Sequence, residues 1–277
     1  MVLSSALPLI ASAQGLAEVL LCLENEIDLA LGVPDDAKAA TIATLWKYSK
    51  FPVVVVVPRE NDAHDYFEQL KIWTNTEVNI YSSHGILPYE RKEIDPSIVQ
   101  QRLATISKLN RQEIQEPPLI ITSVQSLMSH TLAKTDFERT FTTISLDQDL
   151  KLEIFIQTLI SIGYKQESVV TNFGEFAHRG GIVDLFTPLA AYPIRIEFFG
   201  DVIESIRTFD PVNQMTIRPE KNFIIGPASE WISSSSEIES FTNNFSNISS
   251  EKSLEELTNL KNGYLPSPSL YLSLIHI

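Results

Sequence analysis

The sequence has little cysteine and little positive charge. Its single cysteine, Cys22, rules out a disulfide within the chain and is typical of a reducing compartment. Lys and Arg number 21 against 35 Asp and Glu, a net charge of -14. Non-specific DNA binding depends on clustered cations that displace counterions from phosphates. The balance therefore disfavours a protein that coats nucleic acid, without excluding a local basic site.

The sequence also lacks a metal-binding pattern and a membrane-spanning run, which narrows the possible functions. The five histidines are scattered, and no Cys/His pattern has the spacing of a zinc site, so we expect no bound metal. No apolar run approaches the roughly 18 residues that a membrane-spanning helix needs, so we expect no membrane contact. The apolar start, Met1 to Gly15, contains Ala11-Ser12-Ala13, which resembles a signal-peptide cleavage site. Because the first basic residue is Lys38, we expect this segment to begin a folded, cytoplasmic protein.

The first half of the chain alternates between strand-like and helix-like patterns. Strands are predicted over 27–31, 52–58, 77–81 and 119–122, and helices over 35–47, 60–73 and 96–109. Five consecutive valines between Pro52 and Pro58 are typical of a central parallel strand that is buried on both faces. Repeated strand–helix units predict an α/β fold with a mostly parallel, doubly wound sheet that has helices on both faces.

The pattern changes after about Thr140. A helix is predicted over 150–162, ended by Gly163, and short strands over 174–179, 182–186, 193–199 and 202–209. Glycine turns between these strands predict a small inserted α+β domain of antiparallel hairpins. We expect domains at 1–140 and 141–226, followed by a truncated segment at 227–277. The tail from 266 to 277 has no formally charged side chain, and we expect it to be non-native in a chain that is a fragment.

One segment resembles a degenerate phosphate-binding loop. A P-loop reads G-x-x-x-x-G-K-[ST] between a strand and a helix, and its backbone amides, Lys and hydroxyl hold phosphates and magnesium. Here Gly32 and Lys38 have the right spacing, but Ala37 replaces the second glycine and Ala39 replaces the hydroxyl residue. The segment is therefore expected to be a P-loop-like site that no longer binds ATP.

The same segment carries two carboxylates where phosphates would lie. Asp35 and Asp36 repel an anion, and Pro34 lacks a backbone N–H that the loop could use. The simplest interpretation of Asp35 or Asp36 is that it caps the helix that follows.

The strand predicted at 193–199 has an unusual face. Alternation directs Ile194, Ile196 and Phe198 into a core, and Arg195, Glu197 and Phe199 to the other side. One interpretation is an ordinary Arg195–Glu197 surface pair, with Phe199 under a loop. The other is a protein–protein hot spot, because an aromatic ring beside an arginine is typical of interface centres. The pattern alone favours neither.

Arg179 lies just before Gly180 and Gly181. Glycines there could let the backbone of a partner approach closely. Alternatively, Arg179 is a plain surface residue or is paired with Asp184 or Glu175.

Three motifs then resemble a known family. They are Gly174–Phe186, which reads GEFAHRGGIVDLF, Pro193–Phe199, which reads PIRIEFF, and Ile203–Pro211, which reads IESIRTFDP. In this order they are similar to the N-terminal module of bacterial transcription-repair coupling factors (Mfd), which is homologous to the excision-repair protein UvrB. Leu87–Tyr89, Gln101–Ala104 and Gly163–Tyr164 also match, so that the resemblance covers about Ile27 to Pro227. Thr187, Val202 and Met215 depart from the pattern.

The resemblance implies a protein-binding role in nucleotide excision repair. By motif, the residues that would contact UvrA are Arg179, Arg195 and Phe199. RNA polymerase, double-stranded DNA, ATP and magnesium are expected to bind elsewhere in a full-length protein, where a C-terminal domain would cover the UvrA-binding face. For this fragment we expect no catalytic residue, no cofactor and no motor activity.

A UvrB-like, ATP-dependent damage-verification protein is the alternative. It would need an intact P-loop and an aromatic-rich hairpin, whereas the stretch from Ser82 to Pro96 has Tyr89 as its sole aromatic residue. A nucleotide-dependent enzyme meets the same objection at Ala37 and Ala39, and no Ser/His/Asp set or pair of carboxylates indicates another chemistry.

Overall fold

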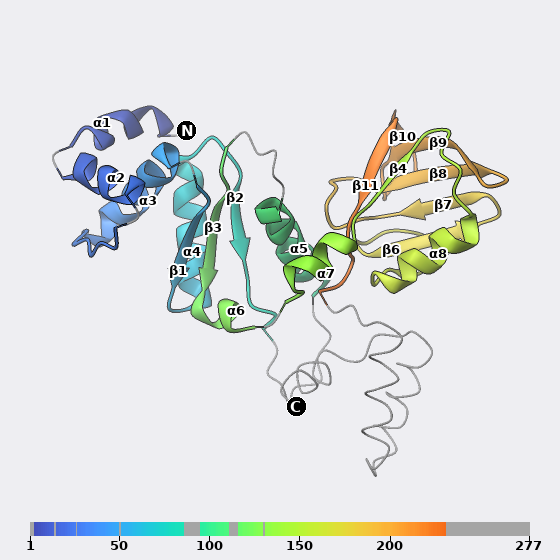
Figure 1. Cartoon of the computed structure of the whole chain (residues 1–277), viewed down its shortest axis with the longest axis horizontal. Helices are drawn as coiled ribbons and strands as arrows, with labels where there is room; N and C mark the ends of the chain where they lie inside the picture. The colour runs from blue at the N-terminus through green and yellow to red at the C-terminus, as the bar shows by residue number, and fades with distance from the viewer. Residues whose placement is uncertain are drawn as a thin grey trace, which may run out of the picture. The chain divides into compact units, whose positions relative to one another are not determined.

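The computed structural model describes residues 3–13, 15–25, 27–49, 51–85, 95–110, 116–129 and 131–230. The chain divides into two compact units (Figure 1). The first unit comprises Met1–Ser83 and Thr105–Ser129, and the second comprises His84–Ala104 and the chain from His130 onward. The expectations for 231–277 and for the Leu87–Tyr89 match lie outside the described residues. The domain boundaries at 140 and 226 remain predictions.

The first unit is built on a parallel three-stranded sheet in the order β1-β3-β2. Its strands are β1 (Val53–Val57), β2 (Val78–Tyr81) and β3 (Leu119–Ser123), close to the predicted ranges. The prediction that the valine run is the central strand is wrong. β3 is central and buried throughout, whereas among the described residues β1 pairs only with β3, and Val54 and Val56 are each nearly half exposed. Because one face of β1 is open, the valines on that face are partly exposed, although the sequence pattern predicts buried positions for them.

Helices cover both faces of this sheet, as predicted. On one face α3 (Asp35–Tyr48) and α4 (Glu60–Trp73) pack through Trp46 and Leu70 against Leu119 and Ile121. On the other face α5 (Pro96–Asn110) reaches β2, where Thr105 donates to the Ile80 carbonyl oxygen at 3.2 Å. Asp95, just before α5, accepts from the Ser97 amide at 2.9 Å, as an N-cap residue does.

Short helices complete the first unit. They are η1 (Ser4–Ala6), α1 (Leu7–Ala11), α2 (Leu16–Glu24) and α6 (Val124–Met128). In the part of the chain that is described, no single helix is long and apolar enough to cross a bilayer. The pair Ser4–Ala11 and Leu16–Glu24 meets the criteria of length and composition only together, with a bend of 87° between them.

The strand predicted over 27–31 is absent. Residues 27–34 have no helix or strand, and Ile27, Leu29 and Leu31 are about half exposed. Because the apolar run ends at Gly32 without pairing to the sheet, the strand–loop–helix frame of a P-loop is missing here. The helix predicted to follow it is present as α3.

The second unit contains the predicted antiparallel hairpins (Figure 1). Strands β6 (Glu175–Arg179), β7 (Ile182–Leu185), β8 (Ile194–Phe199) and β9 (Val202–Phe209) pair in sequence order, each antiparallel to the next. Two further strands extend the sheet to six, in the order β10-β9-β8-β7-β6-β5. Sequence patterning missed these two, β5 (Lys165–Gln166) and β10 (Thr216–Pro219), and also β4 (Thr142–Ser145), β11 (Asn222–Ile225) and α7 (Lys134–Arg139).

Helix α8 (Leu152–Ser161) closes the core of the second unit on one face of the six-stranded sheet. The ring of Phe155 lies 5.9 Å from that of Phe198, measured between centroids. Gly163 ends the helical segment with φ +95°, and a Cβ there would lie 2.5 Å from the Ser229 Cβ. Glycine is therefore required at this position both by the backbone conformation and by the space available.

Candidate protein-interaction face

Strand β8 carries the candidate site, and its alternation is as predicted. Ile194, Ile196 and Phe198 are buried in the core with α8, and Arg195, Glu197 and Phe199 lie on the opposite side. We call that side of the six-stranded sheet the outer face. Phe199 is 78% exposed, which excludes the interpretation that a loop covers its ring.

Strand register places Arg179 on the outer face as well. Arg179 pairs with Ile182 across β6 and β7, and Ile182 pairs with Glu197 across β7 and β8. Directly opposed residues share a face of the sheet, so the three residues predicted to bind UvrA lie on one side. Strand spacing puts the Cα atoms of Arg179 and Arg195 roughly 12 Å apart.

Arg195 is held by its own domain. Its Nε and Nη2 donate to the two carboxylate oxygens of Asp184 at 2.6 and 2.8 Å, and Nη2 also donates to Gln214 Oε1 at 3.3 Å. The guanidinium carbon lies 4.9 Å from the centre of the Phe209 ring. Hydrogen bonds to Asp184 raise the pKa of Arg195, against the opposing effect of burial. The side chain is 26% exposed, so only part of it can reach a partner.

The structure does not contain the Arg195–Glu197 pair that was one of the two interpretations of this face. Glu197 instead forms an ion pair with Arg207 of β9. Asp184 lies directly opposite Arg195 across β7 and β8, and Arg207 is the diagonal neighbour of Glu197 across β8 and β9, so each charge is paired with a residue of a neighbouring strand.

The guanidinium group of Arg179 is bound to a backbone carbonyl rather than to a carboxylate. Its Nη2 donates to the Ser168 carbonyl oxygen at 2.5 Å, and among the described residues it makes no ion pair. The predicted alternatives, Asp184 and Glu175, have other partners. Asp184 binds Arg195, and Glu175 accepts from the amides of Thr171 and Asn172, both at 2.8 Å.

Of the two glycines after Arg179, Gly181 packs closely against strand β8. A Cβ at Gly181 would lie 2.7 Å from the Phe198 carbonyl oxygen, while the Phe198 amide donates to the Gly181 carbonyl oxygen at 2.7 Å. This close approach by the domain's own strand explains the glycine at position 181. That the glycines let the backbone of a partner approach stays a prediction.

Sequence patterning missed two apolar members of this face. Ile182 is 38% exposed at the start of β7, and Val202 is 41% exposed at the start of β9, directly opposite Phe199. A bulge between Glu197 and Phe198 in the β8–β9 register keeps Ile203 and Ile206 both in the core. Val202 was noted only as a departure from the family pattern, and its pairing could not be derived from spacing alone.

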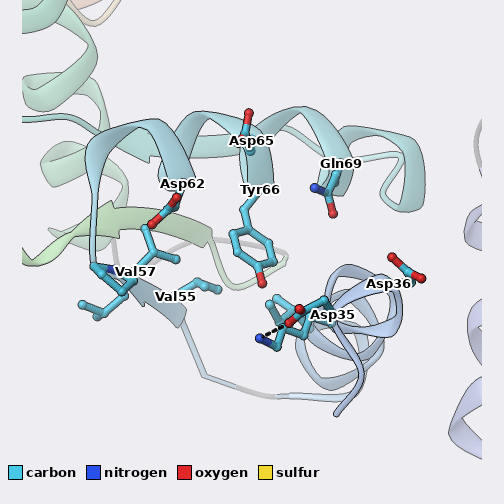
Figure 2. A pocket seen from close by; sticks show the side chains of 12 residues that line it. Asp35, Asp36, Val55, Val57, Asp62, Asp65, Tyr66 and Gln69 are labelled. Atoms are coloured by element: carbon cyan, nitrogen blue, oxygen red, sulfur yellow. Dashed lines mark ion pairs between the residues drawn. The ribbon is translucent and has the colours of Figure 1, made fainter.

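The degenerate nucleotide loop borders an open pocket of about 720 Å³ in the first unit (Figure 2). Four carboxylates line it: Asp35, Asp36, Asp62 and Asp65. The ammonium group of Lys38, which also lines the pocket, binds Asp35 at 2.6 Å. This pair lowers the pKa of Asp35 and raises that of Lys38. Phosphate would therefore meet mostly negative charge at this site.

The loop residues lie in the start of α3 rather than in a phosphate cradle. Pro34 is the N-cap, and the Ala37 amide donates to the Pro34 carbonyl oxygen at 2.9 Å. Ala39 is buried in the core, and Gly32 is exposed in the irregular segment before the helix. The prediction that Asp35 or Asp36 caps α3 by a side-chain hydrogen bond is wrong, although both acidic groups do lie in its first turn, where they favour the helix dipole.

A buried charge cluster in the second unit contains Arg102 of the segment Gln101–Ala104. Arg102, fully buried, donates to both carboxylate oxygens of Glu230 at 2.5 and 2.8 Å, and His84 Nε2 lies 3.4 Å from the same carboxylate. Burial raises the pKa of Glu230, but His84 and Arg102 bring it below its ordinary value. The cluster joins α5 to the chain after β11, a contact between residues 128 positions apart.

In the described part of the chain, no group of three or more His, Cys, Asp or Glu side chains is placed to hold a metal ion.

Sequence comparisons identify relatives of this chain. Residues 142–231 match the family model of the UvrB interaction domain. A transcription-repair-coupling factor of Myxococcus xanthus is 29% identical over 206 residues, covering 72% of this chain and 17% of the relative. One from Staphylococcus aureus (strain USA300) is 29% identical over 205 residues, covering 74% and 17%. The UvrABC system protein B of Mycoplasma mobile is 28% identical over 224 residues, covering 76% and 33%.

The match to the family model includes every strand of the outer face, and the wider identity extends over most of the chain. The chain spans only 17% of the length of the coupling factors that it matches. Residues 142–231 thus match the UvrB interaction domain, and most of the chain is homologous to the N-terminal region of transcription-repair-coupling factors and to UvrB.

Proposed function

We propose that the outer face of this chain docks UvrA and so recruits it to lesions where RNA polymerase has stalled, in transcription-coupled nucleotide excision repair. The observation that carries the proposal is Phe199, a large apolar ring that is 78% exposed on a regular strand. Arg179 lies on the same face with no carboxylate partner among the described residues. An exposed aromatic ring and a guanidinium without an ion pair on one face are typical of the centre of a protein interface.

We assign no catalysis and no cofactor to these residues, and we place the protein in the cytoplasm. The ATP-driven motor with its magnesium, the RNA polymerase contact and the double-stranded DNA contact of a complete coupling factor would be made by other residues. What supports this is the acidic pocket at the degenerate loop, together with Ala37 and Ala39 in the positions of functional P-loop residues.

A UvrB-like, ATP-dependent damage-verification role is the second candidate, favoured by the 28% identity to UvrB over 76% of the chain. Two features of the first unit oppose it. The segment before Gly32 is not a strand, and four aspartates line the pocket that a triphosphate would enter.

The proposal is tested by measuring the affinity of the whole chain for purified UvrA. We expect Phe199→Ala to weaken binding about 30-fold, the loss typical of an interface hot spot, and Arg179→Glu to weaken it at least as much. Met128→Ala, which removes an equally exposed side chain from α6, and Arg218→Glu on β10 are the matched controls. Wild-type affinity in both Phe199→Ala and Arg179→Glu would refute the proposal.

A further inference from the structure

Three exposed apolar side chains meet at one corner of the outer face. Phe199 and Val202 are directly opposed across β8 and β9. Ile182 opposes Glu197, two residues before Phe199, which makes Ile182 a diagonal neighbour of Phe199 at about 7–8 Å between Cα atoms. All three are more than a third exposed, although the same strands bury their alternate residues almost completely. We call these three residues the apolar corner.

The charges between the apolar corner and the far end of the face are neutralised in pairs. Asp184 binds Arg195, and Glu197 binds Arg207. A partner that broke either ion pair would leave both of its charged groups without their partner. Because new contacts must first offset that cost, these groups contribute little binding energy. Within the described residues of this face, Arg179 has no ion pair, and it lies directly opposite Ile182 at the apolar corner.

We propose that the apolar corner of Ile182, Phe199 and Val202 inserts as one body into an apolar recess on UvrA whose rim carries a carboxylate opposite Arg179. This inference rests on the proposed function and adds the chemistry of the surface that the partner must present. Arg195 is then a positioning residue, which supports the strand beneath Phe199 through Asp184 and Phe209.

The apolar corner and Arg179 indicate which surface of UvrA would complement them. A corner that exposes three apolar side chains gains affinity only from a surface that removes all three from water, whereas a flat polar surface would leave them hydrated. The unneutralised guanidinium beside it selects a partner with negative charge at that point. The exposed corner is also continuous with Phe199, around which the proposed interface is centred.

The test uses threonine replacements. Threonine is also branched at Cβ, but a hydroxyl takes the place of one methyl group of valine or of the ethyl group of isoleucine. In the whole chain, Ile182→Thr and Val202→Thr should each weaken the affinity for purified UvrA about tenfold, because each leaves a hydroxyl in an apolar recess. The matched control is Ile224→Thr, since Ile224 is 46% exposed on β11 of the separate two-stranded sheet. It should bind like the wild type.

A second arm tests the carboxylate. Affinity of the wild type should fall as salt rises from low to physiological ionic strength, and Arg179→Met should abolish most of that dependence. Equal salt dependence in the two proteins would overturn the carboxylate opposite Arg179.

The outcomes separate the two proposals. If Phe199→Ala loses binding but both threonine variants match Ile224→Thr, the apolar recess is refuted and the docking role stands. If Phe199→Ala and Arg179→Glu also bind normally, the docking role itself fails. Loss of binding by the threonine variants together with an unchanged control supports the recess.

Discussion

Reversing the charge of Arg195 should destabilise the sheet as well as any interface. Arg195→Glu would place a second carboxylate opposite Asp184, whose side chain is 8% exposed and which would lose both charge-assisted hydrogen bonds. Breaking a buried ion pair by removing one partner typically costs 3–5 kcal/mol, and because Arg195 is partly exposed we expect about 3 kcal/mol. Local opening of β7 and β8 should then be roughly 150-fold more frequent, since 1.4 kcal/mol corresponds to a factor of ten.

Hydrogen exchange of peptides that cover β7 and β8 measures this opening directly, without assuming that the two units unfold together. Arg218→Glu is the matched control, because Arg218 is 72% exposed and pairs with Glu220 on the edge of the sheet. It should change exchange by less than about threefold, in keeping with a surface pair. If exchange in β7 and β8 is the same for Arg195→Glu and for the wild type, the Asp184–Arg195 pair does not support the sheet, and the positioning role of Arg195 is refuted.

Two further predictions concern the first unit. Burial alone would raise the pKa of Glu60, but hydrogen bonds from Ser123, Ser83 and Ser126 lower it below its ordinary 4.5. A depressed carboxylate pKa stabilises the fold above the unfolded value. The protection factors of β3 amides, taken relative to intrinsic exchange at the same pH, should therefore fall as pH drops below about 4.5, and Glu60→Gln should flatten this response. An identical pH profile for the two proteins would contradict the assignment. Calorimetric titration with ATP and magnesium should show no binding at the acidic pocket, and an affinity in the micromolar range would contradict the view that the loop is degenerate.

Local patterns predicted the elements whose burial is set by their own sequence. The alternation along β8 identified its core side correctly, because successive side chains on a strand point to opposite faces whatever the strand pairs with. The helices α3, α4, α5 and α8 were predicted for the same reason, since apolar residues at helical spacing need only one packed face.

Errors arose where a neighbour decides the outcome. The valine run of β1 satisfies the pattern of a central strand, yet its position in the sheet depends on which strands pair with it. The segment 27–31 is apolar enough for a strand, but within the described ranges no strand pairs with it, and a strand is stabilised only by pairing. β5 and β10 are too short or too polar to be seen without the strands that they extend.

For the candidate site, the order of residues along the chain already implied a two-sided strand with an arginine and a phenylalanine directed outward, and motif resemblance added Arg179. Which of those groups is available to a partner was decided by tertiary structure. Asp184, Phe209 and Gln214 converge on Arg195 from three other segments, whereas Arg179 meets a backbone carbonyl and Phe199 meets water. The order of residues along a strand determines to which side of the sheet a side chain points. Whether its charge is paired and how much of it is exposed depend on groups that only folding brings within a few ångströms.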